Sequence, residues 1–253
     1  MELQVTRAGF AAVKGTRHLA YDAVALDARG ALGDRRYCLV DVTGRRVLKT
    51  VQHPALVAVT AEVEGRRLAV ALPGGESVSA EPTSSGETLT CDYWGRPVPL
   101  ELLDGPHAAL FSRHLGREVR LAAAPRGGVV FGEPLTLVTT ASVRDLAERT
   151  GRRGISDDLP GAAARFRATL LVATDEPYAE ERWLGQEVEA GGVRLRIGAP
   201  IPRCAVIDLD PATGERDGRL LKALATYRPL NRAGEPAFGV YARVVRPGTV
   251  SPS

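Results

Sequence analysis

The stretch QEVEAGGVRLRI, residues 186–197, decides the fold class. Two runs of alternating apolar and polar residues flank Gly191-Gly192, an arrangement typical of a two-residue β-hairpin. Because successive side chains of a strand point to opposite faces, Arg194 and Arg196 are predicted to face solvent. The apolar residues between and beside them are predicted to face a core: Val193, Leu195 and Ile197. The chain is therefore expected to contain antiparallel strands with one buried face.

The first hundred residues show the same pattern in shorter runs. Alternating segments occur at 56–62, 67–72, 89–92 and 98–102, with turn residues between them. Helical periodicity is nearly absent in this half, so we expect a small barrel or sandwich. An amphipathic helix is predicted over 107–115, ended by Gly116, with a strand following at 119–123.

Pro125-Arg126-Gly127-Gly128 is the best candidate linker. After it, strands are predicted at 135–138, 169–173 and 239–245, and helices at 142–150 and 220–227. Ser142 to Asp145 resembles a capping box at the start of the first of these helices. The predicted fold class is mainly β with a few short helices.

The composition limits the partners and the compartment. The 253 residues are 44% hydrophobic, which is ordinary for a globular protein, and a net charge of +3 is too balanced for a nucleic-acid-binding surface. No segment resembles a signal peptide or approaches the ~20 apolar residues of a membrane helix. Three cysteines fit a reducing compartment. We therefore expect a cytoplasmic protein with no nucleic-acid or membrane partner.

Several common site signatures are absent. No segment matches a P-loop or a dinucleotide fingerprint, and the four histidines lack zinc-site spacing. Three cysteines are too few for an ordinary iron–sulfur cluster. The segment DLDPATG, residues 208–214, is similar to a calcium loop, but Ala212 stands at the third ligand position. A surface turn is predicted there instead.

Cys204 is the cysteine with surroundings that could activate it. The preceding Pro200-Ile201-Pro202 restricts the backbone, and the adjacent Arg203 favours the thiolate, the form that binds soft metals or attacks sulfur. At this point, however, the residues alone favour a buried, inert cysteine over a functional one. Cys38 and Cys91 are predicted to be structural.

Lys14, Arg36 and Arg167 lie beside predicted strands and could be either surface charges or anion ligands. Arginine suits oxyanions because its planar fork can bind two oxygens at once. None of the three decides between these alternatives by itself.

Taken in order, short motifs along nearly the whole chain resemble the MOSC family, the molybdenum-cofactor sulfurase C-terminal domain proteins. The similarity includes the N-terminal β-barrel domain found in mitochondrial amidoxime-reducing component. The motifs are VKGTR (13–17), GDRRY (33–37), LVD (39–41), TAS (140–142), RFR (165–167), PRC (202–204), DPATG (210–214), YR (227–228) and FGVY (238–241). The resemblance implies two β-barrel-like domains, a MOSC N-terminal domain over 1–124 and a MOSC domain over 125–253.

The resemblance also implies a site for the molybdenum cofactor, molybdopterin. By this similarity Cys204 is the catalytic residue and the protein ligand to the metal. The residues implied in binding the cofactor are Lys14, Gly15, Arg36, Thr140, Ser142, Arg167, Thr169 and Arg203. The chain departs from the family pattern at Thr169, where relatives carry asparagine, at Gly15, where serine is common, and at Glu133, where relatives carry a hydroxyl residue. A carboxylate at that last position is expected to repel a phosphate.

The leading hypothesis is a molybdenum-dependent oxidoreductase that reduces N-hydroxylated or similar N–O substrates. Its electrons are expected from a separate protein such as a ferredoxin, a flavoprotein or a haem protein, and pyridoxal phosphate is not expected to take part. The alternatives are a metal-independent sulfur carrier, sulfurtransferase or C–S bond enzyme that uses Cys204 as nucleophile or persulfide, and a carrier of the cofactor. The sequence leaves these open.

Overall fold

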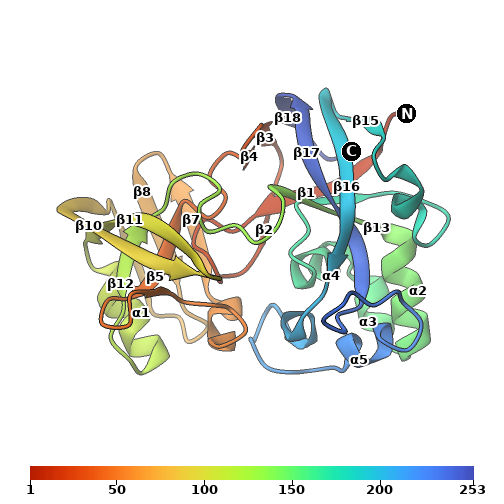
Figure 1. Ribbon diagram of the computed structural model, residues 1–253. Coiled ribbons are helices and arrows are strands. Elements are labelled where there is room, and N and C mark those ends of the chain that lie inside the picture. Colours follow the sequence, from red (N-terminus) through yellow and green to blue (C-terminus); the bar gives the residue numbers. More distant parts are fainter.

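The computed structural model describes all 253 residues and shows two lobes side by side (Figure 1). One lobe contains a closed five-stranded barrel, and the other contains a seven-stranded sheet with helices packed beside it. The predicted fold class, mainly β with a few short helices, is confirmed. None of the helices is long and apolar enough to cross a membrane.

The barrel is built from the first half of the chain. Its strands follow the order β10 (Thr83–Tyr93), β11 (Arg96–Asp104), β12 (Arg120–Ala123), β5 (Tyr37–Asp41) and β6 (Arg46–Val47). Neighbouring strands are antiparallel, and a parallel bridge between Asp92 and Arg46 closes the barrel. Cys38 and Cys91 are buried in its interior, as expected for structural cysteines. Burial raises the pKa of the Cys38 thiol to about 12.

A three-stranded antiparallel sheet covers one side of the barrel lobe. It consists of β7 (Thr60–Glu64), β8 (Arg67–Ala71) and β9 (Ser77–Ala80). The helix α1 (His107–Leu115) has its predicted bounds and ends at Gly116, whose φ is 63°. Residues 56–58, predicted as strand, lie instead in the 3-10 helix η1 (Pro54–Ala58), because proline in the first turn favours a helical φ.

The seven-stranded sheet forms the second lobe. Its order is β15 (Glu187–Ala190), β16 (Val193–Pro202), β17 (Ala237–Arg246), β13 (Leu135–Thr139), β14 (Leu170–Val172), β1 (Val5–Phe10) and β2 (Leu19–Tyr21). The hairpin predicted at 186–197 is confirmed as β15 and β16. The alternate apolar residues of β16 join a core of 20 buried side chains. Arg194 and Arg196 pair with carboxylates of β15, Glu189 and Glu187.

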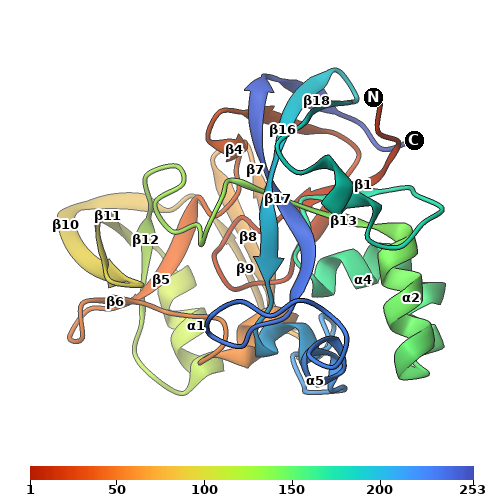
Figure 2. The same cartoon turned by 45° about the vertical axis from the view of Figure 1, so that its right-hand side comes forward.

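Helices connect β13 to the parallel strand β14 and pack against one face of this sheet (Figure 2). They are α2 (Thr140–Thr150), α3 (Arg153–Asp157) and α4 (Leu159–Arg165), with α5 (Leu220–Leu224) and the 3-10 helices η2 (Ala179–Trp183) and η3 (Ala205–Asp208) nearby. The capping box predicted at Ser142 is wrong. The helix begins two residues earlier, and the Ser142 hydroxyl donates to the buried carboxylate of Glu180.

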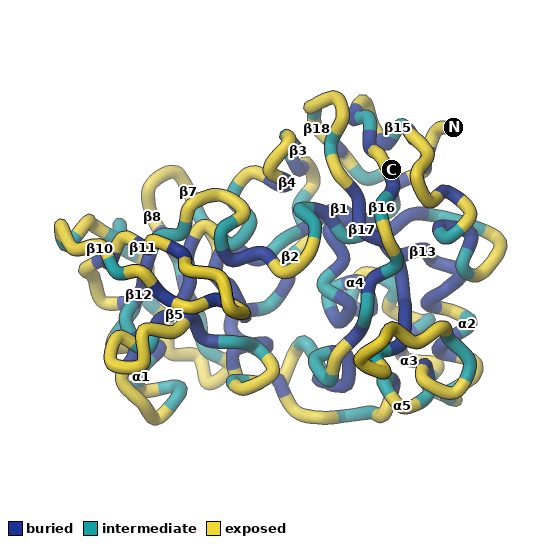
Figure 3. Tube along the Cα trace, viewed as in Figure 1, coloured by how far each residue is buried: buried dark blue, intermediate teal, exposed yellow.

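The two lobes share the N-terminal segment. β1 pairs with β14, and β3 (Val24–Asp27) pairs with β4 (Gly30–Ala31) and with the C-terminal strand β18 (Gly248–Val250). The division into residues 1–124 and 125–253 stays a prediction. Figure 3 shows that the buried parts of the chain follow the strands of both lobes, whereas exposed residues concentrate in the loops.

Removing the ring of Phe111 is expected to destabilise the barrel lobe strongly. Phe111 is fully buried in the core between α1 and the small sheet. Phe111→Ala should lower the free energy of unfolding by about 3–5 kcal/mol, as is typical when a cavity replaces a phenyl ring. Urea denaturation measures this change. The control is Leu230→Ala: this residue is 52% exposed, so a shift beyond about 0.5 kcal/mol there would contradict the burial assignment.

Candidate functional site

A cavity of about 300 Å³ lies where the two lobes meet. The barrel lobe and its loops contribute Lys14, Gly15, Arg35, Lys49, Tyr93 and Trp94, among others. The sheet lobe contributes Thr136, Phe166, Arg167, Arg203, Cys204 and Tyr241, among others. The wall holds six cationic side chains and one carboxylate, that of Glu235. Such an excess of positive charge suits an anionic ligand.

The segment that carries Lys14 ties one lobe to the other. After β1 leaves the seven-stranded sheet, residues 11–14 run beside β5 of the barrel. The Lys14 amide donates to the Tyr37 carbonyl at 2.8 Å, and the Tyr37 amide donates to the Ala12 carbonyl at 3.0 Å. Gly15 follows with a φ of 97°, a left-handed conformation that favours glycine. The loop therefore turns at the cavity with Lys14 fixed on its wall.

Lys14 is a buried cation without a counter-ion. Only 8% of the residue is exposed, and its ammonium lies 5.1 Å from the centre of the Tyr93 ring. Burial lowers the Lys14 pKa to about 7, and the neighbouring positive charges of Arg35 and Arg167 act in the same direction. An anion in the cavity would favour the charged form of the lysine and so couple binding to proton uptake.

Arg35, not the predicted Arg36, lies on the cavity wall. Arg35 has a φ of 46°, a left-handed conformation that breaks the alternation of side chains ahead of β5. Its guanidinium forms an ion pair with Asp34, while Arg36 is exposed and stacks 5.4 Å from the Tyr37 ring. The structure therefore puts Arg36 outside the candidate site.

Arg167 reaches from the sheet lobe across to the Lys14 loop. It follows the end of α4 with a φ of 52°, and its Nη1 donates to the Thr16 carbonyl at 2.8 Å. Burial, together with the nearby positive charge of Arg35, lowers its pKa to about 10. Behind it, the Thr136 hydroxyl donates to the Arg167 carbonyl and contacts the Thr169 hydroxyl at 3.2 Å. Thr169 therefore supports the wall from behind.

Arg203 presents an unused hydrogen-bond donor. Its Nε donates to the Phe238 carbonyl at 2.7 Å and its Nη1 to the Phe166 carbonyl at 2.8 Å, but its buried Nη2 has no partner. A Cβ on Gly239 would lie 3.2 Å from that Nη2 and 2.5 Å from the Leu137 carbonyl oxygen, so glycine leaves the guanidinium room. Burial lowers the Arg203 pKa to about 10. An unsatisfied buried donor of this kind indicates a missing acceptor.

Cys204 stands exposed at the end of β16, where two cavities meet. It lines the cationic cavity and also a second cavity of about 600 Å³, whose other cations include Arg216, Arg219 and Lys222. The prediction of a buried cysteine is wrong, because Cys204 is exposed and lines both cavities. No group of three or more His, Cys, Asp or Glu side chains is arranged to hold a metal ion.

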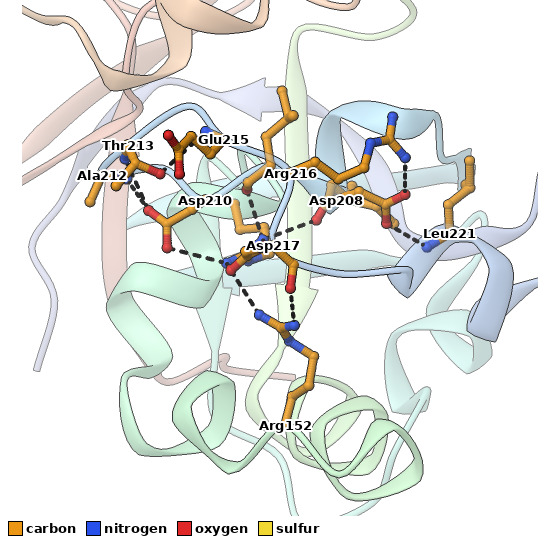
Figure 4. Close-up of polar contacts among 12 residues, drawn as sticks. Arg152, Asp208, Asp210, Ala212, Thr213, Glu215, Arg216, Asp217 and Leu221 are labelled. Atoms are coloured by element: carbon orange, nitrogen blue, oxygen red, sulfur yellow. Dashed lines mark hydrogen bonds and ion pairs between the residues drawn. The ribbon is translucent and has the colours of Figure 1, made fainter.

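A network of ion pairs anchors the loop that follows Cys204 (Figure 4). Asp217 accepts from Arg165 at 2.7 and 2.8 Å and from Arg152 at 2.7 Å. The Asp210 carboxylate accepts from the amides of residues 212 and 213, so the predicted surface turn is confirmed for 210–213. The first two residues of the predicted range are buried instead, Asp208 at the end of η3 and Leu209 in a β-bridge to Arg216. With this loop pinned to α3 and α4, the backbone at Cys204 is held between fixed elements.

Three further predicted positions lie away from the cavity. The Thr140 hydroxyl interacts with the backbone of Thr174, and Ser142 binds Glu180 and the Tyr178 amide. Glu133 forms an ion pair with Arg243. The guanidinium lowers the pKa of the Glu133 carboxyl, and its positive charge balances the negative charge of the carboxylate. The expected repulsion between Glu133 and a phosphate therefore has no basis in this structure.

Sequence reasoning missed much of the wall: Arg35, Lys49, Tyr93, Trp94, Phe131, Thr136, Glu235 and Tyr241. For Arg35 the signal was present in the motif GDRRY, but a left-handed residue makes the direction of its side chain unpredictable from alternation. The aromatic residues lie in a hairpin turn, a linker and a strand, which no local pattern connects.

Comparisons with known proteins agree with this architecture. The family profile described as "MOSC domain" matches residues 112–253, and the one described as "MOSC N-terminal beta barrel domain" matches residues 11–118. The chain is 27% identical over 229 residues to "Molybdenum cofactor sulfurase" of Caenorhabditis elegans, covering 86% of this chain and 30% of that protein.

A second relative and a solved structure are more limited matches. The Caenorhabditis briggsae protein of the same name is 32% identical over 127 residues, covering 50% of this chain and 16% of that protein. The chain thus spans less than a third of the length of either relative. A crystal structure of the YUAD protein from Bacillus subtilis aligns with a TM-score of 0.45 at 11% identity, covering 100% of this chain and 92% of that one.

Sulfate binding should weaken as the pH rises from 6 to 9. Sulfate keeps its charge over this range, whereas Lys14 loses its proton near pH 7, or somewhat higher once the anion is bound. Losing one unit charge beside the anion is expected to cost affinity on the order of tenfold. Calorimetry of the Cys204→Ser protein measures the sulfate affinity at each pH. In a Lys14→Met background the pH dependence should disappear; an unchanged pH dependence would rule out Lys14 as its source.

Proposed function

Since the chain belongs to the MOSC domain family, we propose that its cationic cavity binds the molybdenum cofactor, with Cys204 as the protein ligand to molybdenum. The observation that carries the proposal is the unpartnered, buried Nη2 of Arg203, one residue before an exposed thiol. A phosphate or pterin oxygen would supply the acceptor that this donor lacks. The residues present therefore fit the group.

In this proposal the anionic part of the cofactor is held by four cationic residues: Lys14, Arg35, Arg167 and Arg203. They come from four separate segments, so they can surround an anion rather than bind it from one side. Their desolvated charges interact more strongly with an anion than exposed arginines would. Cysteine sulfur is a soft ligand and suits a sulfur-rich metal centre.

We propose that the protein is a molybdenum-dependent oxidoreductase that reduces N-hydroxylated or related N–O substrates. When bound, the cofactor would supply the two-electron chemistry that removes an oxygen atom from the substrate. The chain's own contribution is to hold the cofactor and to leave Cys204 open to the second cavity, from which a substrate can approach. A separate protein would deliver the electrons.

A second candidate is sulfur transfer without bound metal, because the Cys204 thiol is exposed and reachable from the 600 Å³ cavity. Relatives that match half or more of this chain are named molybdenum cofactor sulfurases. In this alternative the sulfur of Cys204 would act as nucleophile or carry a persulfide. A carrier of the cofactor would use the same cavity without turnover.

The proposal predicts different effects for two neighbouring arginines. In protein made in a host that synthesises the cofactor, Arg35→Ala should lower the molybdopterin content at least severalfold. Arg36→Ala should leave it unchanged, because Arg36 is exposed outside the cavity. Fluorescence of the oxidised pterin after release measures the content. Equal losses in both variants, or none in Arg35→Ala, would contradict the assigned cavity.

A second pair of variants separates metal chemistry from sulfur transfer. Cys204→Ser should lose most of the bound molybdenum and all turnover of an amidoxime with an artificial reductant. Cys91→Ser, in the barrel core, should keep both. Metal-free wild type that gains the mass of one sulfur on Cys204 would replace the first candidate with the second.

A further inference from the structure

Two aromatic rings stand exposed at the edge of the cationic cavity. Trp94 is 49% exposed and Phe131 is 52% exposed. Of the nine large hydrophobic residues that the chain exposes, three line this one cavity: Val51, Trp94 and Phe131. Exposed apolar side chains that cluster at a cavity indicate a binding surface, whereas single ones scattered over a protein surface are ordinary.

The backbone conformation at position 94 is unfavourable for tryptophan. Trp94 and Gly95 form the two-residue turn between β10 and β11, with φ angles of 56° and 77°. Such a turn favours Asn-Gly, and a bulky residue in the left-handed conformation is strained there. Burial does not offset this strain, because half of the side chain remains in solvent. The tryptophan therefore serves something other than the stability of the hairpin.

Contacts hold the two rings as a pair. Their centroids lie 5.2 Å apart with planes inclined by 53°. The Lys49 ammonium lies 3.8 Å from the centre of the Trp94 ring. Arg96, next in the hairpin, donates from Nη2 to the Val130 carbonyl at 2.7 Å and so fastens the linker that carries Phe131. The pair thus joins the barrel hairpin to the linker between the lobes.

We propose that Trp94 and Phe131, which contact each other, form an aromatic platform against which a flat heteroaromatic ring lies in the cationic cavity. The platform refines the proposed function, and the identity of the anionic group on the ring rests on that proposed function. Aromatic side chains stack on flat rings of any substitution pattern, while the buried Lys14 and Arg203 select an anion on the same ligand. Two sources share this chemistry: the pterin of the cofactor and the ring of an aromatic substrate.

A docked protein is a poorer occupant of this surface. The rings line a cavity that also contains deeply buried cations, whereas a protein partner would need a broad face. A small ligand with a flat ring and an anionic substituent meets both sets of groups at once.

The first test follows ring binding in cofactor-free protein through Trp94 itself. The chain has two tryptophans, and the other, Trp183, is buried in the core of the second lobe, so Trp183→Phe leaves Trp94 as the sole reporter. Titration with 6-hydroxymethylpterin phosphate should quench the fluorescence of Trp94. Methyl phosphate, which has the anion without the ring, should bind about tenfold more weakly.

Calorimetry of Trp94→Asn and Phe131→Ala then measures what each ring contributes. Each variant should bind the pterin phosphate about 5–30-fold more weakly, as expected for one stacking partner, and should bind methyl phosphate within twofold of wild type. Asparagine suits the turn at position 94, so the hairpin should be preserved. Thermal unfolding checks that both variants fold.

A second experiment tests whether the bound ring belongs to an aromatic substrate. In molybdenum-loaded protein with normal cofactor content, Trp94→Asn should raise the KM for benzamidoxime at least fivefold relative to acetamidoxime if the aromatic platform binds the substrate ring. A ring-specific loss of binding in either experiment supports the platform, and no such loss in both experiments overturns it. If methyl phosphate fails to bind while unphosphorylated pterin still quenches Trp94, the platform stands and the proposed cofactor site fails.

Discussion

Burying positive charge without a carboxylate partner is the constraint that organises this protein. Lys14 is almost completely buried without a counter-ion, and Arg203 is satisfied by two backbone carbonyls with one nitrogen left over. Desolvating an unpaired cation costs several kcal/mol, which is why burial lowers the pKa of each. A fold that retains such groups stores free energy that an anionic ligand can release on binding.

The cationic cavity depends on the two-lobed architecture, because both lobes contribute the cations that line it. Residues 11–14 leave the seven-stranded sheet and pair with β5 of the barrel, and Arg167 donates back across the junction to the Thr16 carbonyl. The cavity thus exists only where both lobes meet. Glycine at 239 keeps a side chain away from Arg203, and the ion pairs around Asp217 hold the loop after Cys204. The stability of the rest of the fold offsets the energetic cost of this strained, charged site.

Local patterns predicted most of the elements and less of the site. Alternation located β16, and an amphipathic run with a terminal glycine located α1, because both signals depend on neighbours a few residues apart. The resemblance to the MOSC family, not local periodicity, pointed to Lys14, Arg167, Arg203 and Cys204, and the structure brings these four to one cavity. Local reasoning failed at Ser142, whose capping pattern is overridden by a hydrogen bond to the buried Glu180, a contact 38 residues away in sequence.

The sequence by itself determined which segments become strands, where the apolar faces lie, and which cysteine has an activating neighbour, since each depends on local spacing and residue type. Only the tertiary structure decided that Arg35 rather than Arg36 lines the cavity, because a left-handed residue ahead of β5 reverses the expected side. The tertiary structure alone also shows that Trp94, in a hairpin turn, lies beside Phe131, in the linker. Side chains from distant segments become neighbours only when long-range packing is complete, and no local spacing records that.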